Sequence, residues 1–217
     1  MKKAFTLAEV LITLTIIGIV AAITINIIFS NQDEAYRSGL KKSYSIMQQA
    51  LKKAAYDNGG FMPIKYDPDS DENIDQITDA IFNSYMKVLK DCTRVSCNTS
   101  GKPIQIKNLT GTATYSNMES NTRYSCAVIL QDGTYFRVPS ISSDGSMTII
   151  TDVNGIHKGP NRLGKDAFVF RYDGPNDKLI PGGAEGSGWS TCNKSDTAID
   201  NGAGCADILL KNGKIPR

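Results

Sequence analysis

The residues that decide the fold are the first 29, MKKAFTLAEVLITLTIIGIVAAITINIIF, in which a short basic head precedes an apolar run. Residues 5–29 contain a single charged side chain, Glu9. A helix over this segment would be about 37 Å long, and the hydrocarbon core of a bilayer is roughly 30 Å thick. We therefore expect a membrane-spanning helix with its basic N-terminus in the cytoplasm and the rest of the chain exported.

Glu9 needs a partner, because a carboxylate inside a membrane helix is costly unless it is paired or protonated. Cleavage before Phe5 would create a free amine four residues from Glu9, on the same helix face. Glu9 could then pair with its own amine or with the amine of a neighbouring subunit, which would make it an assembly contact. The alternative is an interfacial acid on a plain signal anchor. A cleaved secretory signal peptide fits poorly, because its apolar region would be shorter and uncharged.

The basic head, Ala4, the run Phe5-Thr-Leu-Ala-Glu9 and the apolar stretch resemble the prepilin signal of type IV pilins and type II secretion pseudopilins. The resemblance covers the N-terminal segment alone. It implies that a membrane aspartyl peptidase cuts between Ala4 and Phe5 and methylates the new amine. It also implies that Glu9 pairs with the N-terminus of an adjacent subunit. Two residues depart from the family pattern: Ala4 stands where Gly is usual, and Asn26 where many members have a Pro that kinks the helix.

We expect three parts: a leader peptide over residues 1–4, a transmembrane and assembly helix over 5–29, and an exported pilin-like head over 30–217. Residues 30–57 should continue the helix, because apolar residues recur there at three- and four-residue steps. Asn58-Gly59-Gly60 is a helix stop. The apolar stripe consists of Tyr36, Leu40, Tyr44, Met47, Leu51 and Ala55.

The remainder predicts an α+β, pilin-like fold in which the long helix packs against a small antiparallel β-sheet. A second helix is expected from about 72 to 90, and period-two alternation predicts strands at 123–130, 134–138, 146–153 and 167–172. Met147, Ile149, Phe168 and Phe170 should face inward. Pro175–Gly188 is rich in Gly and Pro and predicts a loop, and residues 206–211 predict a short helix or strand.

The five cysteines suggest two local disulfides in an exported chain, Cys92–Cys97 and Cys192–Cys205, although other pairings remain open. The second pair also resembles the disulfide-bounded region near the C-terminus of many pilins. Cys126 is left over, on the apolar face of a strand, where a cysteine usually behaves as a small hydrophobe. The single histidine, His157, is expected in a solvated loop, so neither a zinc cluster nor a Cys–His catalytic dyad is favoured.

Asp152, Asn154 and Asp166, with Asn161 between them, could gather oxygen ligands for calcium. The spacing differs from the twelve-residue helix-loop-helix calcium site, because Gly155 comes too early and no Glu closes the loop. The alternative is a turn in which Asp152 and Asn154 bond their own backbone. No other cofactor is expected.

The charge balance, 24 basic against 22 acidic side chains, gives no indication of nucleic-acid binding. The hypothesis is a non-enzymatic structural subunit of a type IV pilus or a type II secretion pseudopilus. Its partners would be other subunits, the prepilin peptidase and the bacterial inner membrane. We expect a single pass with the N-terminus cytoplasmic, followed by a filament in the periplasm or on the cell surface. The alternative is a signal-anchored monomeric enzyme or ligand-binding domain.

Overall fold

A computed structural model describes residues 6–60, 75, 77–93, 95–98, 104–117 and 126–211, with side chains at all of these except 24–31. The chain divides into two compact units, Met1–Ala35 and Tyr36–Arg217. The predicted leader, residues 1–4, lies outside the described residues, as do residues 123–125 of the predicted strand at 123–130 and residues 72–74 and 76 of the predicted second helix.

The first element is α1, an α-helix over Leu7–Asp57 that runs through both units. Its C-terminal end is closed by two glycines in the left-handed region, Gly59 at φ 78° and Gly60 at φ 93°. The backbone N–H of Gly60 donates to the carbonyl of Ala55 at 2.7 Å, which satisfies one of the carbonyls left free at the helix end. The predicted stop at Asn58-Gly59-Gly60 is therefore confirmed.

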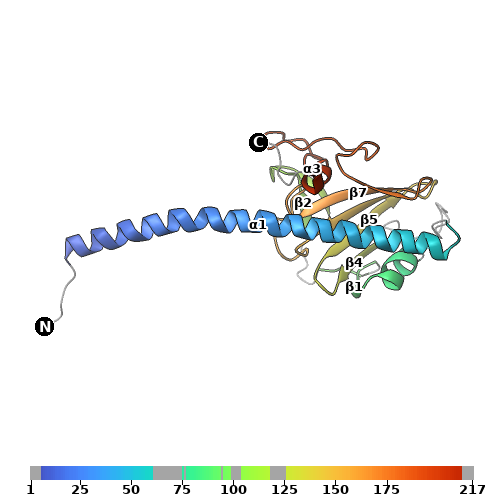
Figure 1. The fold of residues 1–217 in the computed structure, drawn as a ribbon, viewed down its shortest axis with the longest axis horizontal. Coiled ribbons are helices and arrows are strands. Elements are labelled where there is room, and N and C mark those ends of the chain that lie inside the picture. Colours follow the sequence, from blue (N-terminus) through green and yellow to red (C-terminus); the bar gives the residue numbers. More distant parts are fainter. Residues whose placement is uncertain are drawn as a thin grey trace. The chain divides into compact units, whose positions relative to one another are not determined.

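A six-stranded sheet in the order β1-β4-β5-β6-β7-β8 forms the centre of the second unit (Figure 1), and every neighbouring pair is antiparallel. A separate two-stranded hairpin pairs β2 with β3. The strands are β1 (Val88–Asp91), β2 (Gln105–Lys107), β3 (Thr114–Asn117), β4 (Cys126–Leu130), β5 (Tyr135–Ile141), β6 (Met147–Asp152), β7 (Ala167–Asp173) and β8 (Lys178–Pro181).

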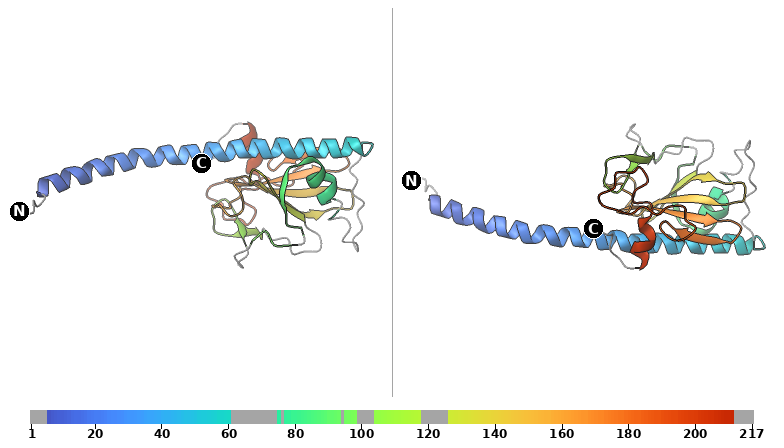
Figure 2. Two further views of the ribbon diagram at one scale, coloured as in Figure 1. Left: turned by 90° about the horizontal axis from the view of Figure 1, so that it is seen from below. Right: turned by 90° about the horizontal axis from the view of Figure 1, so that it is seen from above.

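One face of this sheet is covered by helices. Figure 2 shows the part of α1 that belongs to the second unit lying along the sheet, with α3 (Cys205–Lys211) and the π-helix η1 (Thr78–Asn83) beside it. The core on this face joins Leu40, Met47 and Leu51 of α1 to alternate strand residues. The alternate strand residues in this core include Cys126, Val128, Met147, Ile149, Phe168 and Phe170. The predicted α+β layout and its inward-facing residues are thus confirmed.

The opposite face of the sheet is also buried, which the sequence did not predict. Ala127, Ile150 and Val169, the neighbours of the first set along their strands, join a second core with Ile106 of the hairpin and Leu163. Side chains alternate between the two faces of a strand, so the central strands have an interior on both sides. The covering layer on this second face consists of the β2–β3 hairpin and long loops, not helices.

The predicted second helix at 72–90 is wrong in its C-terminal part. The helical segment is short, contains the π-helix Thr78–Asn83, and gives way to strand β1 at Val88. Val88 pairs with Leu130 and Asp91 with Val128, so the apolar residues beyond Tyr85 serve the edge of the sheet. The helix prediction failed here because it rested on local periodicity alone. The backbone hydrogen bonds to β4, which is distant in the sequence, favour a strand.

The predicted loop at Pro175–Gly188 is also partly wrong, because Lys178–Pro181 forms β8 on the edge of the sheet. Tyr172 of β7 is opposite Leu179 of β8, and the hydroxyl of Tyr44 in α1 donates to the Leu179 carbonyl at 3.0 Å. These contacts tie the edge strand to the helix. The segment 206–211, expected as helix or strand, is the helix α3.

Gly39 lies where α1 packs closely against Val153. A Cβ at this position would lie 2.8 Å from Cβ and 3.0 Å from Cγ2 of Val153, which follows β6. Real Cβ atoms essentially never come that close. A glycine that is unfavourable for helix propensity is therefore required for the helix to approach the end of the sheet.

Candidate functional site

The N-terminal site is built around Glu9 in the first turn of α1. Thr6 donates to Oε2 of Glu9 twice, from its backbone N–H at 2.9 Å and from its hydroxyl at 2.8 Å. The backbone N–H of Glu9 donates in return to the Thr6 hydroxyl at 3.3 Å. This is the reciprocal capping box, in which an N-cap Thr and an acid three residues later satisfy orphan donors of the first helical turn.

Thr6 is the residue that the sequence analysis missed. The signal was present, because a Ser or Thr followed three residues later by an acid, just before an apolar run, is the pattern of a capping box. The acid at position 9 therefore has a local structural role within its own helix. Ala4 and Phe5, between which cleavage is predicted, lie outside the described residues.

Beyond this cap, α1 presents apolar side chains to solvent on all sides. Every described side chain from Thr6 to Ile23 is exposed, with Leu7 at 80% and Ile17 at 64%. Large contiguous apolar surfaces of this kind mark protein or membrane contact sites. The large exposed apolar residues of this stretch are Leu7, Val10, Leu11, Ile12, Leu14, Ile16, Ile17, Ile19, Val20 and Ile23. Within the part of the chain that the structure describes, no helix is long and apolar enough to cross a bilayer.

Two disulfides stabilise the second unit, Cys92–Cys97 and Cys192–Cys205, with Cα atoms 5.2 and 5.0 Å apart. These are the two pairs that the sequence suggests. Cys126 is free and fully inside the core, and burial raises the pKa of its thiol to about 12. His157 is exposed. A thiol with a raised pKa is a poor nucleophile at neutral pH, so this cysteine has the properties of a core residue.

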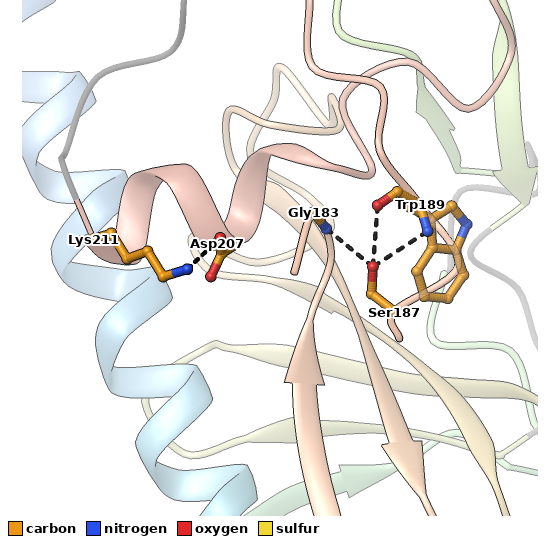
Figure 3. Close-up of polar contacts among 5 residues, drawn as sticks. All are labelled: Gly183, Ser187, Trp189, Asp207 and Lys211. Carbon is orange, nitrogen blue, oxygen red and sulfur yellow. Dashed lines mark hydrogen bonds and ion pairs between the residues drawn. The ribbon is translucent and has the colours of Figure 1, made fainter. Parts of the chain in front are cut away.

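Polar contacts stabilise the loop and the helix of the C-terminal region, as Figure 3 shows. The Ser187 hydroxyl accepts from the backbone N–H groups of Gly183 and Trp189, at 3.2 and 3.3 Å, and donates to the Trp189 carbonyl at 3.0 Å. On α3, Lys211 forms an ion pair with Asp207 at 2.8 Å, one helical turn away. The backbone N–H of Asp207 donates to the Gly182 carbonyl at 2.9 Å, which fastens the start of α3 to this loop.

The candidate calcium residues lie at the end of β6 and in the loop between β6 and β7. Oδ1 of Asp152 accepts from the backbone N–H groups of Asn154 and Gly155, at 3.2 and 2.9 Å, so the turn expected as the alternative is present. The two oxygens of Asp166 accept from the N–H groups of Asn161 and Arg162, each at 2.8 Å. Among the described residues, no group of three or more His, Cys, Asp and Glu side chains is placed to hold a metal ion.

The electrostatics of this loop are unfavourable for two free carboxylates. Asp152 and Asp166 are both 0% exposed. Burial, followed by the nearby charge of Asp166, raises the pKa of Asp152 well above its ordinary value. Burial likewise raises the pKa of Asp166, against the effect of the Arg162 and Asn161 amides, which lower it. The loop therefore holds two acids whose charge is destabilised.

Comparison with known families identifies the class of N-terminal segment. Residues 1–25 match the family model of the prokaryotic N-terminal methylation motif. The chain therefore carries the signature of the prepilin-type signals of type IV pilins and pseudopilins, as the sequence analysis predicted. The comparisons with curated proteins and with solved structures give no match.

Proposed function

We propose that the chain is a structural subunit of a type IV pilus or a type II secretion pseudopilus, without catalysis of its own. In this proposal it is cut between Ala4 and Phe5 and polymerises through its N-terminal helix. The observation that carries the proposal is the methylation motif over residues 1–25. Most of this motif belongs to helix α1, and its side chains from Thr6 to Ile23 are all exposed. A helix with apolar residues around its whole circumference needs an apolar environment.

The parts of the subunit follow from this proposal. Residues 1–4 are the leader, residues 5–29 hold the subunit in the inner membrane and later pack in the filament, and residues 30–217 form the exported head. The support for the membrane segment is its composition, one charged residue between positions 5 and 29. The two disulfides of the head suit an oxidising compartment outside the cytoplasm.

Assembly is proposed to use the carboxylate of Glu9. In the free subunit the two hydrogen bonds from Thr6 both engage Oε2. A carboxylate accepts several hydrogen bonds through its two oxygens, so Glu9 can keep its cap and still receive the methylated amine of an incoming subunit. In an apolar bundle an unpaired carboxylate is costly, so the arriving amine stabilises the filament.

Intact-mass measurement of the chain purified from membranes tests the proposal. The expected mass lacks Met1 to Ala4 and contains one additional methyl group, with fragmentation placing that methyl on the amine of Phe5. Cells that lack the prepilin peptidase provide the control and should yield the full-length mass. An unprocessed Met1 terminus in cells with an active peptidase contradicts the proposal and favours a signal-anchored monomer.

A further inference from the structure

Two neighbouring strands of the head bring a pair of acids together inside the protein. Asp152, the last residue of β6, is opposite Ala167 of β7, and the backbone N–H of Val153 donates to the carbonyl of Asp166 at 2.9 Å. Both carboxyl side chains are fully buried. The fold therefore holds the two acids side by side at one end of two central strands, where water does not stabilise their charges.

Three side-chain oxygens at the end of β6 and in the loop that follows have no hydrogen-bond donor among the described residues. They are Oδ2 of Asp152, Oδ1 of Asn154 and Oδ1 of Asn161, and all three atoms are buried. The amide orientations are fixed, because Nδ2 of Asn154 donates to the Gly159 carbonyl at 3.2 Å and Nδ2 of Asn161 to the Ile156 carbonyl at 3.1 Å. Buried acceptors without a partner are rare and costly.

No cationic side chain compensates these acids within the described residues. The ion pairs found there are Lys42 with Asp132 and Lys211 with Asp207, and neither involves the β6–β7 loop. The loop thus combines two buried carboxyl groups with acceptor oxygens that lack donors among the described residues. A hard divalent cation supplies what is missing, since Ca²⁺ takes six to eight oxygen ligands from carboxylates, amide and backbone carbonyls and water.

We propose that the β6–β7 loop binds one calcium ion through Oδ2 of Asp152, Oδ1 of Asn154 and Oδ1 of Asn161, with Asp166 supplying the second negative charge. All four residues are candidates from the sequence, and the structure adds which oxygen atoms lack a donor among the described residues. Asp166 also accepts the backbone N–H groups of Asn161 and Arg162, so it holds the loop in its curved path. The inference is independent of the proposed filament role, because it concerns the head alone.

The test is a calcium titration of the full-length chain in detergent after EDTA treatment, followed by calorimetry and thermal unfolding. We expect one site with a Kd on the order of 10⁻⁵ to 10⁻³ M, the range from sensor to extracellular calcium sites. Saturating calcium should raise the Tm by roughly 5–10 °C. Magnesium should bind more weakly, because it is smaller and gives up its water reluctantly. The absence of calcium binding, or an equal response to both ions, overturns the proposal.

Two variants locate the ion. Asp152→Asn keeps the shape and the acceptor for the Asn154 N–H, removes one charge, and should weaken calcium binding at least about tenfold. Asp144→Asn is the matched control, because Oδ1 of Asp144 accepts the Ser146 N–H at 2.9 Å in a similar turn but the side chain is exposed. This control should bind calcium like the wild type. Wild-type affinity in Asp152→Asn overturns the assignment.

A gain-of-function variant keeps the test decisive if Asp152→Asn does not fold. Asn161→Asp adds a third carboxylate at a position whose backbone φ is 51°, in the left-handed region that Asn and Asp tolerate. More ligand charge tightens calcium sites, so the affinity should rise about tenfold. An unchanged or weaker affinity in this variant contradicts Asn161 as a ligand.

Discussion

The hydroxyl and the backbone N–H of Thr6 both donate to the same carboxylate oxygen of Glu9, Oε2, at 2.8 and 2.9 Å. Glu9 therefore has a structural partner in its own helix, independent of the proposed contact with a second subunit. Two functions, helix capping and proposed assembly, converge on one side chain. They depend on different chemistry, because a cap needs an acceptor whereas pairing with an amine needs a negative charge.

Substitutions can separate these two functions. Glu9→Gln keeps an acceptor for Thr6 but loses the charge, so filament yield should fall at least about tenfold. This corresponds to a loss of about 1.4 kcal/mol in the free energy of pairing with the amine, because each 1.4 kcal/mol changes an equilibrium constant tenfold. Thr6→Ala removes the cap at a cost of about 1 kcal/mol in helix-end stability but keeps the charge, so filament yield should stay near wild type. Sheared-filament yield relative to membrane-bound subunit is the measurement. The reverse ranking of the two variants would show that Glu9 acts through the cap.

Gly39 should tolerate a methyl group poorly. Gly39→Ala gains about 1 kcal/mol of helix propensity but places the added methyl 2.8 Å from Cβ of Val153. Overpacking costs about 1–3 kcal/mol, so we expect the Tm of the full-length chain to fall by a few degrees. Gly18→Ala is the matched control in the same helix, because nothing lies within 4 Å of the added methyl. It should leave the Tm unchanged or slightly raised.

The cause of the Gly39 effect can be checked by a double-mutant cycle. Val153→Gly removes the three atoms that the new methyl would meet, including Cβ at 2.8 Å and Cγ2 at 3.0 Å. The double variant Gly39→Ala with Val153→Gly should therefore be less destabilised than the sum of the single variants. Strict additivity would show that the two residues do not meet.

Removal of the Cys192–Cys205 disulfide should destabilise the head. The bridge closes a loop with a sequence separation of 13 and joins the C-terminal loop to the buried start of α3. A loop of this size contributes about 3 kcal/mol in the chain-entropy model, so Cys192→Ser with Cys205→Ser should lower the Tm by roughly 6–12 °C. Cys92→Ser with Cys97→Ser, with a sequence separation of 5, should cost less. Equal losses from the two double variants would contradict the loop-length argument.

The Cys126 thiol should be inert in the folded protein. Burial raises its pKa from the ordinary value of 9.0 to about 12, so the thiolate that reacts with disulfide reagents is scarce at neutral pH. The free energy that the neutral thiol contributes is complete below pH 9.0 and is lost as the pH rises toward about 12. A colorimetric thiol assay should detect one thiol after denaturation and almost none before. Rapid labelling of the native chain at pH 7 would show that the site opens.

Local sequence patterns predicted the secondary structure correctly where the structure of a segment depends mainly on its own residues. The stripe from Leu40 to Leu51 and the glycines after Asn58 predicted the second half of α1 and its end, and period-two alternation predicted β6 and β7. These local patterns failed where pairing with a segment distant in the sequence determines the secondary structure. Val88 continues a helical pattern in the sequence, yet its pairing with Leu130 makes it a strand residue.

The candidate sites show the same division. The N-terminal motif is contiguous, so Glu9 could be singled out from the sequence, and Thr6 could have been found with it. The β6–β7 loop was recognised as a source of oxygen ligands, but burial and the absence of donors depend on the fold. Asn161 was a candidate ligand from the sequence, and the structure adds the orientation of its amide, because its nitrogen donates to the Ile156 carbonyl and leaves Oδ1 without a donor among the described residues.

The sheet with both faces buried has a consequence for how chains of this kind diverge. Residues of β4, β6 and β7 contact an interior on either side, so most changes there disturb packing. The β2–β3 hairpin, the Cys192–Cys205 loop and the outer side of α1 form the outer parts that surround these central strands. We expect natural variation to accumulate in these outer parts, so that the exterior changes while the architecture is inherited unchanged.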